Sequence, residues 1–405
     1  MQSLQVVVIG GGAAGFWAAI ACAEAHPQAQ VTLLEARQPL AKVRISGGGR
    51  CNVTHACFEP ATLVQQYPRG GKALRGAFTR FQPKDTIAWF ARHGVQLKTE
   101  SDGRMFPITD DSETIVSCLL QAARQAGVEI YTASPVQQLE QTQRGFEVLL
   151  KSGRHLPAHR LLLATGSSPQ GHELARGLGH SIEPPVPSLF TFNIPDLNLH
   201  ELAGVAVETA EVKLLTPKLE QLGAVLVTHW GLSGPAVLKL SAWGARILHQ
   251  QRYRAELQIN WLPTDTLESS RQVLLTTKLQ QPKKTLAGFC PVELPRRFWQ
   301  YLVSRAEVDP ERRWAELSKL QVQALLRELH QGRYQIQGKS IFKDEFVTCG
   351  GVRLQEVDFK TMQSRLCPGL FFAGEVLDID GVTGGFNFQS AWTTGWLAGQ
   401  AIGAG

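Results

Sequence analysis

The chain has 405 residues, of which 43% are hydrophobic and 19% charged, so it can bury a substantial core without disulfides or metal ions. This composition excludes global disorder, and the clustering of the 38 glycines in short runs excludes a collagen-like repeat. The length suggests about two to three domains at roughly 150 residues each. The formal net charge of +6 is compatible with a nucleic acid or an anionic cofactor as a partner.

The sequence favours a cytoplasmic protein with no membrane partner. It has no uninterrupted run of about 18 apolar residues, and the apolar run near its start ends in glycines, unlike a signal peptide. The seven cysteines are an odd number and form no C-x-x-C pair, which argues against a secreted disulfide framework. The histidines show no metal-ligand spacing, so we expect no metal site.

The first 35 residues predict a strand, a glycine turn, a helix and a second strand. Residues 4–9 form an apolar run typical of a strand buried on both faces of a parallel sheet. Three glycines follow, and the small apolar residues 13–25 suit a helix that lies close to a sheet. Residues 30–34 predict the next strand, which ends just before Glu35.

Further elements continue this alternation up to about residue 180. Helical spacing covers 83–94 and 111–127, with Asp111 placed to cap the second helix and Gly127 to end it. Short strands are predicted at 128–131, 146–150 and 160–164. The proline-dense segment Glu183–Pro187 is expected to interrupt the regular structure and to mark a domain boundary.

The middle of the chain predicts an insertion that is first rich in strands and then helical. The expected strands are 189–194, 205–215, 223–228 and 253–261, and the helical stretches are 264–280 and 291–330. Parallel-sheet character returns at 369–375, before a final helix from about residue 387 to 402. We therefore expect an α/β protein with a Rossmann-like domain (1–187 and 341–405), an inserted β-barrel-like subdomain (188–262) and an inserted helical subdomain (263–340).

The glycine turn has the spacing of a dinucleotide-binding site, Gly10-x-Gly12-x-x-Gly15. Gly10 permits the tight turn, Gly12 permits close approach of a pyrophosphate, and Gly15 permits helix–sheet packing. Glu35 follows at the spacing at which an acidic residue binds ribose hydroxyls. A glycine-rich packing turn beside a surface glutamate is the alternative.

A second glycine-rich segment, residues 42–54, has cations on both sides. Its backbone amides could hold an anion, with Arg50 adding charge-assisted hydrogen bonds, or the segment could be a surface loop. Cys51 is expected to be a packing residue rather than a nucleophile.

Two features near the C-terminus favour a flavin over NAD as the tightly bound cofactor. Gly374-Glu375 ends an apolar strand, where a carboxylate can bind a polyol chain. Gly384-Gly385-Phe386 leads into the last helix, whose N–H groups can face an electron-rich ring edge. A further motif at 228–235 contains His229 and Ser233 but lacks the G-x-S-x-G pattern of hydrolases, and its Ser233 would either cap a helix or lie over the flavin.

The sequence resembles the BaiN-like NAD(P)/FAD-dependent oxidoreductases, bacterial flavoproteins of the YhiN type. The resemblance rests on V-V-I-G-G-G-A-A-G at 7–15, K-V-R-I-S-G-G-G-R-C-N-V-T at 42–54, T-H-W-G-L-S-G-P at 228–235 and G-E-V-L-D-I-D-G-V-T-G-G-F-N-F-Q-S-A-W at 374–392. It implies that Gly10, Gly12, Ala13, Ala14 and Gly15 hold the FAD pyrophosphate, Glu35 the adenosine ribose and Glu375 the ribityl region. Gly385, Asn387 and Gln389 would line the isoalloxazine. The stretch after Thr165 departs from the family pattern, since it has Gly166-Ser167-Ser168-Pro169 in place of a longer run of glycine, serine and threonine.

The expected cofactor-binding residues are Gly10, Gly12, Ala13, Ala14, Gly15, Glu35, Ala36, Arg37, Lys42, Ser46, Gly47, Gly48, Arg50, Cys51, Asn52, Thr165, Gly166, Gly374, Glu375, Gly384, Gly385, Phe386, Asn387 and Gln389. No catalytic residue is predicted.

These features together predict an FAD-dependent oxidoreductase that exchanges hydride with a small organic substrate through flavin N5 and takes electrons from NAD(P)H as a transient reductant. An oxidase that passes electrons to oxygen is the first alternative. A flavin-bearing RNA-modifying protein ranks third, because the sequence shows no recognisable RNA-binding module with interleaved aromatic and basic residues, and no stable nucleic-acid partner is expected.

Overall fold

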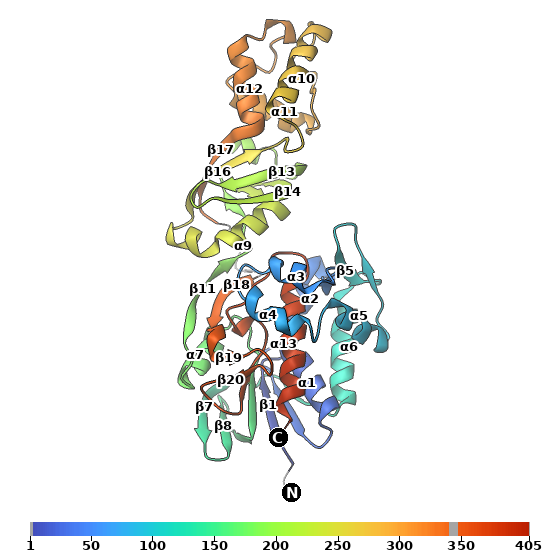
Figure 1. The fold of residues 1–405 in the computed structure, drawn as a ribbon, viewed down its shortest axis with the longest axis vertical. Helices are drawn as coiled ribbons and strands as arrows, with labels where there is room; N and C mark the ends of the chain where they lie inside the picture. The colour runs from blue at the N-terminus through green and yellow to red at the C-terminus, as the bar shows by residue number, and fades with distance from the viewer. Residues whose placement is uncertain (1–2, 340–346, 405) are drawn as a thin grey trace. The chain divides into compact units, whose positions relative to one another are not determined.

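A computed structural model describes residues 3–339 and 347–404 of the chain (Figure 1). The chain divides into two compact units. One, which we call the discontinuous unit, consists of Met1–Val186 and Val347–Gly405, and the other, the inserted unit, is Pro187–Phe346.

The discontinuous unit is built on a seven-stranded sheet in the order β19-β20-β21-β10-β1-β2-β6. Its strands are β1 (Gln5–Ile9), β2 (Gln30–Leu34), β6 (Glu129–Tyr131), β10 (Arg160–Leu163), β19 (Val357–Asp358), β20 (Gln363–Ser364) and β21 (Leu370–Phe372). The five strands from β21 to β6 are parallel, and Val8 of β1 lies between Leu33 and Leu162. This order confirms the predicted Rossmann-like fold, in which β21, from the C-terminal part of the chain, completes the N-terminal sheet.

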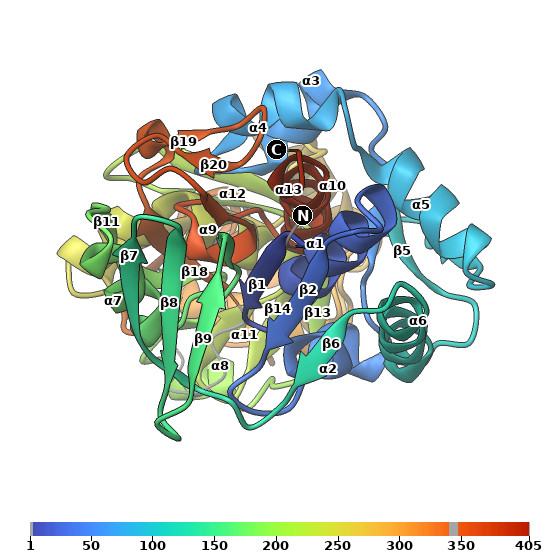
Figure 2. The same cartoon turned by 90° about the horizontal axis from the view of Figure 1, so that it is seen from below.

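Helices surround this sheet. They are α1 (Ala13–Ala25), α2 (Ala41–Gly49), α3 (Pro60–Leu63), α4 (Gly71–Phe78), α5 (Pro83–Arg92), α6 (Ser112–Gln125), α7 (Pro169–Gly177) and α13 (Phe386–Ile402), with short 3-10 turns η1 (Val64–Gln66), η3 (Leu354–Glu356) and η4 (Gly374–Val376). Helices α1 and α13 lie side by side (Figures 1 and 2). A Cβ atom on Gly395 would lie 2.7 Å from the carbonyl oxygen of Ala14, so only glycine allows the two helices to approach this closely.

Smaller sheets complete the discontinuous unit. One contains β3 (Thr54–His55), β5 (Arg104–Pro107) and β4 (Leu97–Thr99), and another contains β7 (Val136–Thr142), β8 (Gly145–Leu150) and β9 (His155–Ala158) (Figure 2). The prediction that Glu183–Pro187 interrupts the regular structure is wrong, because this segment lies within β11 (Ile182–Ser188), which pairs only with β18 (Val347–Val352) among the described residues. Proline is compatible with such a strand, since an edge position does not require every backbone N–H to donate.

The inserted unit contains a six-stranded antiparallel sheet in the order β12-β15-β14-β13-β16-β17. Its strands are β12 (Phe192–Asn193), β13 (Ala206–Leu214), β14 (Leu219–Thr228), β15 (Gly231–Ser233), β16 (Arg254–Asn260) and β17 (Gly332–Gln337). The first and last strands approach each other, because Asn193 N donates to Gly338 O over 3.0 Å and Phe192 bridges to Lys339. The sheet is therefore nearly closed, as expected of a β-barrel-like subdomain. Its last strand, β17, lies in the segment 263–340, for which a helical subdomain was predicted.

The helices of the inserted unit are α8 (Leu197–His200), α9 (Pro235–Gln250), α10 (Leu267–Gln280), α11 (Arg296–Arg305) and α12 (Lys319–Gln331), with the 3-10 turn η2 (Trp314–Glu316). Trp261 and Phe298 pack edge to face at 4.5 Å in its core. Two of the segments predicted here are longer than the observed elements. The helical stretch 291–330 is broken between α11 and α12, and the strand 189–194 shrinks to β12, because Leu189 has a left-handed backbone with φ of 59°.

Candidate functional site

In the glycine turn between β1 and α1, the backbone leaves no room for a side chain at Gly10 and Gly15 but leaves free space at Gly12. Gly10 has φ of 108°, and a Cβ on Gly15 would lie 1.8 Å from the carbonyl oxygen of Gly10. By contrast, a Cβ on Gly12 would meet nothing within 4 Å. Gly12 is also the N-cap of α1, whose first amides lack partners within the helix. The turn thus leaves free space where the helix N-terminus would attract a phosphate group.

Glu35 is held rigidly at the carboxyl end of β2. Its Oε2 accepts a hydrogen bond of 2.7 Å from Gly11 N, and its Oε1 accepts one of the same length from Arg37 N. Ala36 lies between Glu35 and Arg37 in the sequence and takes no part in either hydrogen bond. Each carboxylate oxygen keeps a further lone pair, which suits the hydroxyls of a ribose. Gly11, absent from the predicted set, is part of this arrangement, and the only sequence signal for it was its place in the glycine run.

The second glycine-rich segment ends α2 with a loop of left-handed residues. Gly47, Gly48 and Gly49 have φ of 59°, 68° and 87°, and a Cβ on Gly48 would meet nothing within 4 Å. Ser46 donates its hydroxyl to Val43 O over 2.9 Å, which anchors the start of the loop. The loop therefore presents accessible backbone rather than side chains.

The two residues after this loop, Arg50 and Cys51, both contact other parts of the protein. The Arg50 guanidinium lies 4.0 Å from the centre of the Phe106 ring, and its Nη1 is 2.7 Å from Glu100 Oε1. It is thus already paired with a carboxylate. Cys51 is fully buried, and burial raises the pKa of its thiol to about 12, which confirms its predicted packing role.

Lys42 and Glu375 join the two sequence halves of the discontinuous unit. Lys42 Nζ lies 2.9 Å from Glu375 Oε2 and 3.5 Å from Ser167 Oγ, in the turn that contains Gly166. Glu375 Oε1 accepts a hydrogen bond from Thr348 N over 3.0 Å. The Thr165 hydroxyl is buried without a hydrogen-bond partner and lies against Gly171 of α7. Thr348 and Ser167 had no signal in the sequence.

The start of α13 presents backbone groups, while the side-chain amides of Asn52 and Asn387 form hydrogen bonds within the protein. Gly384 and Gly385 have φ of 128° and 90°. With its amide oriented to satisfy both contacts, the Asn52 oxygen accepts from Gly385 N over 3.0 Å, which brings the α2 loop to the α13 N-terminus. The Asn387 side chain makes two hydrogen bonds with the backbone of Gly381. Phe386 is buried and stacks on His55 at 4.6 Å.

Gln389 is fully buried, and its side chain makes three hydrogen bonds within the protein. Its Oε1 accepts from the hydroxyls of Thr54 (2.6 Å) and Thr86 (3.0 Å), and its Nε2 donates to Thr393 Oγ1 over 3.0 Å. This buried network connects α13 with β3 and α5.

Most of the predicted residues meet along one edge of the central sheet. The glycine turn follows β1, Glu35 follows β2, Thr165 and Gly166 follow β10, and Gly374 and Glu375 follow β21. Ligands of open α/β sheets bind at the carboxyl ends of the parallel strands. The open space at Gly12 and the polar groups at Glu35 and Glu375 fit the phosphate, ribose and polyol groups of FAD. Among residues 3–339 and 347–404, no group of three or more His, Cys, Asp or Glu residues could hold a metal ion.

A family model described as the HI0933-like protein Rossmann domain matches residues 4–401. The chain belongs to this family. Its members are flavin-dependent oxidoreductases with an FAD-binding Rossmann domain, which confirms the resemblance found in the sequence. Within the described ranges, no helix is long and apolar enough to cross a membrane.

Two curated relatives align over nearly the whole chain. The chain is 30% identical over 408 residues to the 3-dehydro-bile acid delta(4,6)-reductase of Clostridium scindens, covering 98% of each protein. It is 32% identical over 417 residues to the ribosomal RNA dihydrouridine synthase of Escherichia coli, covering 99% of this chain and 98% of the relative.

Among solved structures, the fold is similar to that of 3-ketosteroid-delta4-(5alpha)-dehydrogenase from Rhodococcus jostii RHA1. The TM-score is 0.52 at 16% identity, with 100% of this chain and 98% of that chain covered. This similarity supports the fold alone.

Proposed function

We propose that the chain is an FAD-dependent reductase that uses NAD(P)H to saturate a carbon–carbon double bond activated by a carbonyl group. The names of both curated relatives describe saturation of a carbon–carbon double bond. The observation that carries the proposal is the open position at Gly12, beside the rigid carboxylate of Glu35. Bound FAD supplies a hydride carrier at its N5 atom.

The chain's own residues would bind and orient the cofactor. The amides at the N-terminus of α1 would donate to the pyrophosphate, and Glu35 would accept from the adenosine ribose. Lys42 and Glu375 would lie along the ribityl region. The amides at Gly384 and Gly385 would face the ring edge, while the buried Gln389 network would hold α13 in place.

For the substrate, we propose a uracil base in RNA. Uracil contains a double bond conjugated to a carbonyl, and dihydrouridine is the product of its reduction. The net charge of +6 favours a polyanionic substrate, and the Escherichia coli relative acts on ribosomal RNA according to its name. A free enone is the second candidate, favoured by the bile-acid reductase relative. The sequence alone favours a small organic substrate.

The first test is the visible spectrum of the purified protein, followed by anaerobic addition of NADH or NADPH. We expect flavin bands near about 370 and 450 nm, which bleach with at least one nucleotide. Slow reoxidation in air would separate a reductase from an oxidase. A colourless protein that does not take up FAD would refute the proposal.

The substrate is tested next with the reduced protein. Unmodified ribosomal RNA and a steroid with a conjugated 3-ketone would each be added without oxygen, followed by mass spectrometry. A gain of two hydrogens in a uracil supports the RNA substrate, and a gain in the steroid alone supports the second candidate.

A further inference from the structure

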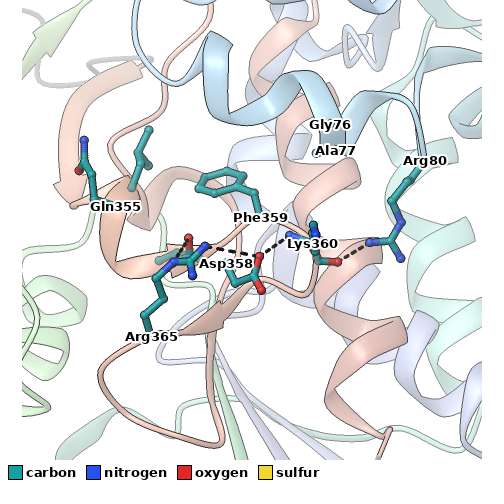
Figure 3. Close-up of a pocket in the computed structure, with 10 residues that line it drawn as sticks. Gly76, Ala77, Arg80, Gln355, Asp358, Phe359, Lys360 and Arg365 are labelled. Atoms are coloured by element: carbon teal, nitrogen blue, oxygen red, sulfur yellow. Dashed lines mark hydrogen bonds and ion pairs between the residues drawn. The ribbon is translucent and has the colours of Figure 1, made fainter.

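A hollow of about 630 Å³ lies in the discontinuous unit between the end of α4 and the hairpin formed by β19 and β20 (Figure 3). Three cations, Arg80, Lys360 and Arg365, line it together with a single carboxylate, Asp358. The Phe359 ring lies among them, below α4. Cations around an aromatic ring suit a nucleotide, because the cations can bind its phosphates and the ring can stack on its base.

The hairpin and the helix are tied together by their own contacts. Arg80 donates to the carbonyl oxygen of Lys360, and Lys360 N donates to Asp358 Oδ1 over 3.0 Å. Arg365 lies 3.7 Å from Asp358 and donates through Nε to Val357 O over 3.3 Å. The cations of the hollow are therefore held near one another by the fold.

The positive charge extends beyond the hollow along α4. Residues 60–84 contain five cations (Arg69, Lys72, Arg75, Arg80 and Lys84) and no acidic residue. Lys72 and Gly76 lie one helical turn apart, so Lys72 is on the face that lines the hollow. Lys72, Arg75 and Lys360 are exposed, and none of them forms an ion pair within the described part of the chain. We call Lys72, Arg75, Arg80, Lys360 and Arg365 the α4 basic surface.

A second hollow of about 610 Å³ in the same unit provides a contrast. It is lined by one arginine, Arg144, and one acidic residue, Glu147, so its formal charges cancel. The excess of cations is thus a local property of the α4 basic surface and not of every hollow in a protein with a net positive charge.

The segment that carries α4 is also joined to the loop that leads into the flavin end of α13. Arg69 forms an ion pair with Asp380, and Val382 N donates to Gln66 O over 2.8 Å. A Cβ on Gly70 would lie 2.6 Å from Ile379, which shows how closely the two segments pack. A polyanion on the α4 basic surface would thus bind next to the segment that precedes Gly384 and Gly385.

We propose that the α4 basic surface binds the phosphodiester backbone of RNA, with Phe359 available to stack on a base. This inference rests on the proposed RNA substrate, but it assigns a separate site whose occupancy is measured without turnover. Each phosphate neutralised would release counterions, so binding would weaken as salt increases.

The test uses the full-length protein and a fluorescein-labelled RNA hairpin, with affinity measured by fluorescence anisotropy between about 50 and 200 mM salt. The variant K72Q/R75Q/K360Q removes three cations that form no ion pair with any described residue. The control R124Q/R144Q/K151Q removes three exposed cations elsewhere in the same unit. We expect at least about a tenfold weaker affinity and a flatter salt dependence for the first variant, and less than about a twofold change for the control.

Equal losses in the two variants, or no loss in either, would overturn the site. So would a loss of binding to phosphatidylserine vesicles with unchanged RNA affinity. The flavin spectrum of each variant is recorded in parallel, because an intact spectrum with lost RNA binding separates this site from the proposed redox function. A protein that binds the hairpin through this surface but takes up no flavin would refute the redox function alone.

Discussion

The α-carbon of Gly15 faces the carbonyl oxygen of Gly10 so closely that a Cβ atom at residue 15 would lie 1.8 Å from it. Gly12, three residues earlier, has free space at the same position. We expect G15A to lose thermal stability and FAD together, because the α1 N-terminus must move away from β1. Thermal denaturation and bound flavin per protein are the measurements.

G12A is the matched variant, and it should separate the two effects. Its added methyl group meets no protein atom, so the melting temperature of the apoprotein should stay within about 2 °C of the parent value. FAD affinity should fall at least about tenfold, because the methyl group occupies the space meant for the pyrophosphate. Normal FAD binding by G12A would show that the cofactor lies elsewhere.

The buried Gln389 network predicts a large stability effect. Q389L leaves the hydroxyls of Thr54 and Thr86 without their acceptor in a buried region. Each unsatisfied buried group lowers the free energy of unfolding by about 1–3 kcal/mol. We expect the free energy of unfolding in urea to fall by about 2–5 kcal/mol. Q400L on the same helix is the control, since its side chain makes one long hydrogen bond of 3.4 Å to Ala21 O. A loss in Q389L no larger than in Q400L would contradict this role.

The ion pair between Lys42 and Glu375 should matter for the cofactor more than for stability. The Lys42 side chain is 56% exposed, and exposed pairs contribute about 0–1 kcal/mol. We expect K42M to melt close to the parent protein while binding FAD about tenfold more weakly, because a cation beside the cofactor is lost. K151M serves as the surface control. Unchanged FAD affinity in K42M, measured by flavin fluorescence, would remove Lys42 from the cofactor site.

A buried histidine predicts how stability depends on pH. The His180 ring contacts Glu356 Oε2 at 3.0 Å and Ser364 Oγ at 2.9 Å, and burial lowers its pKa below 6.5, although Glu356 opposes this shift. Burial lowers the pKa of His172 and His330 in the same direction. Below pH 6.5 the unfolded chain therefore binds protons more readily than the folded chain.

This stabilisation is complete above pH 6.5 and is lost as the pH falls from there through the lower folded-state pKa values. Urea unfolding at about pH 7.5, 6.5 and 5.5 measures the loss, which should be shallower in H180Q. H155Q, which replaces an exposed histidine, is the control. A protein that becomes more stable between pH 6.5 and 5.5 would show that these imidazoles are not held neutral.

Local patterns made the core of the fold predictable. The apolar run before Gly10, the glycine spacing and the acidic residue at position 35 each reflect a strict local requirement of a strand–turn–helix–strand unit. The proline segment Glu183–Pro187 misled the prediction because proline excludes a central strand, while the pairing partner that permits an edge strand is β18, far along the chain.

The details of the site were less predictable, because they depend on contacts between distant residues. Nothing near Arg50 indicates that its guanidinium pairs with Glu100, and nothing near Gln389 indicates that its amide is held by Thr54 and Thr86. For the same reason, the α4 basic surface was not visible as an RNA-binding module. Phe359 and Arg80 are neighbours only after folding.

The close packing of α1 against α13, through Gly395 on Ala14 and Gly399 on Ala18, has a consequence for synthesis on the ribosome. Helix α1 is translated before the inserted unit, but its partner α13 is translated only after that unit. Until then, the apolar face of α1 cannot pack against α13. The inserted unit is continuous in sequence, so it can fold before α13 is synthesised. Chaperones that bind exposed apolar segments should therefore contact nascent chains that already contain the complete inserted unit but still lack α13.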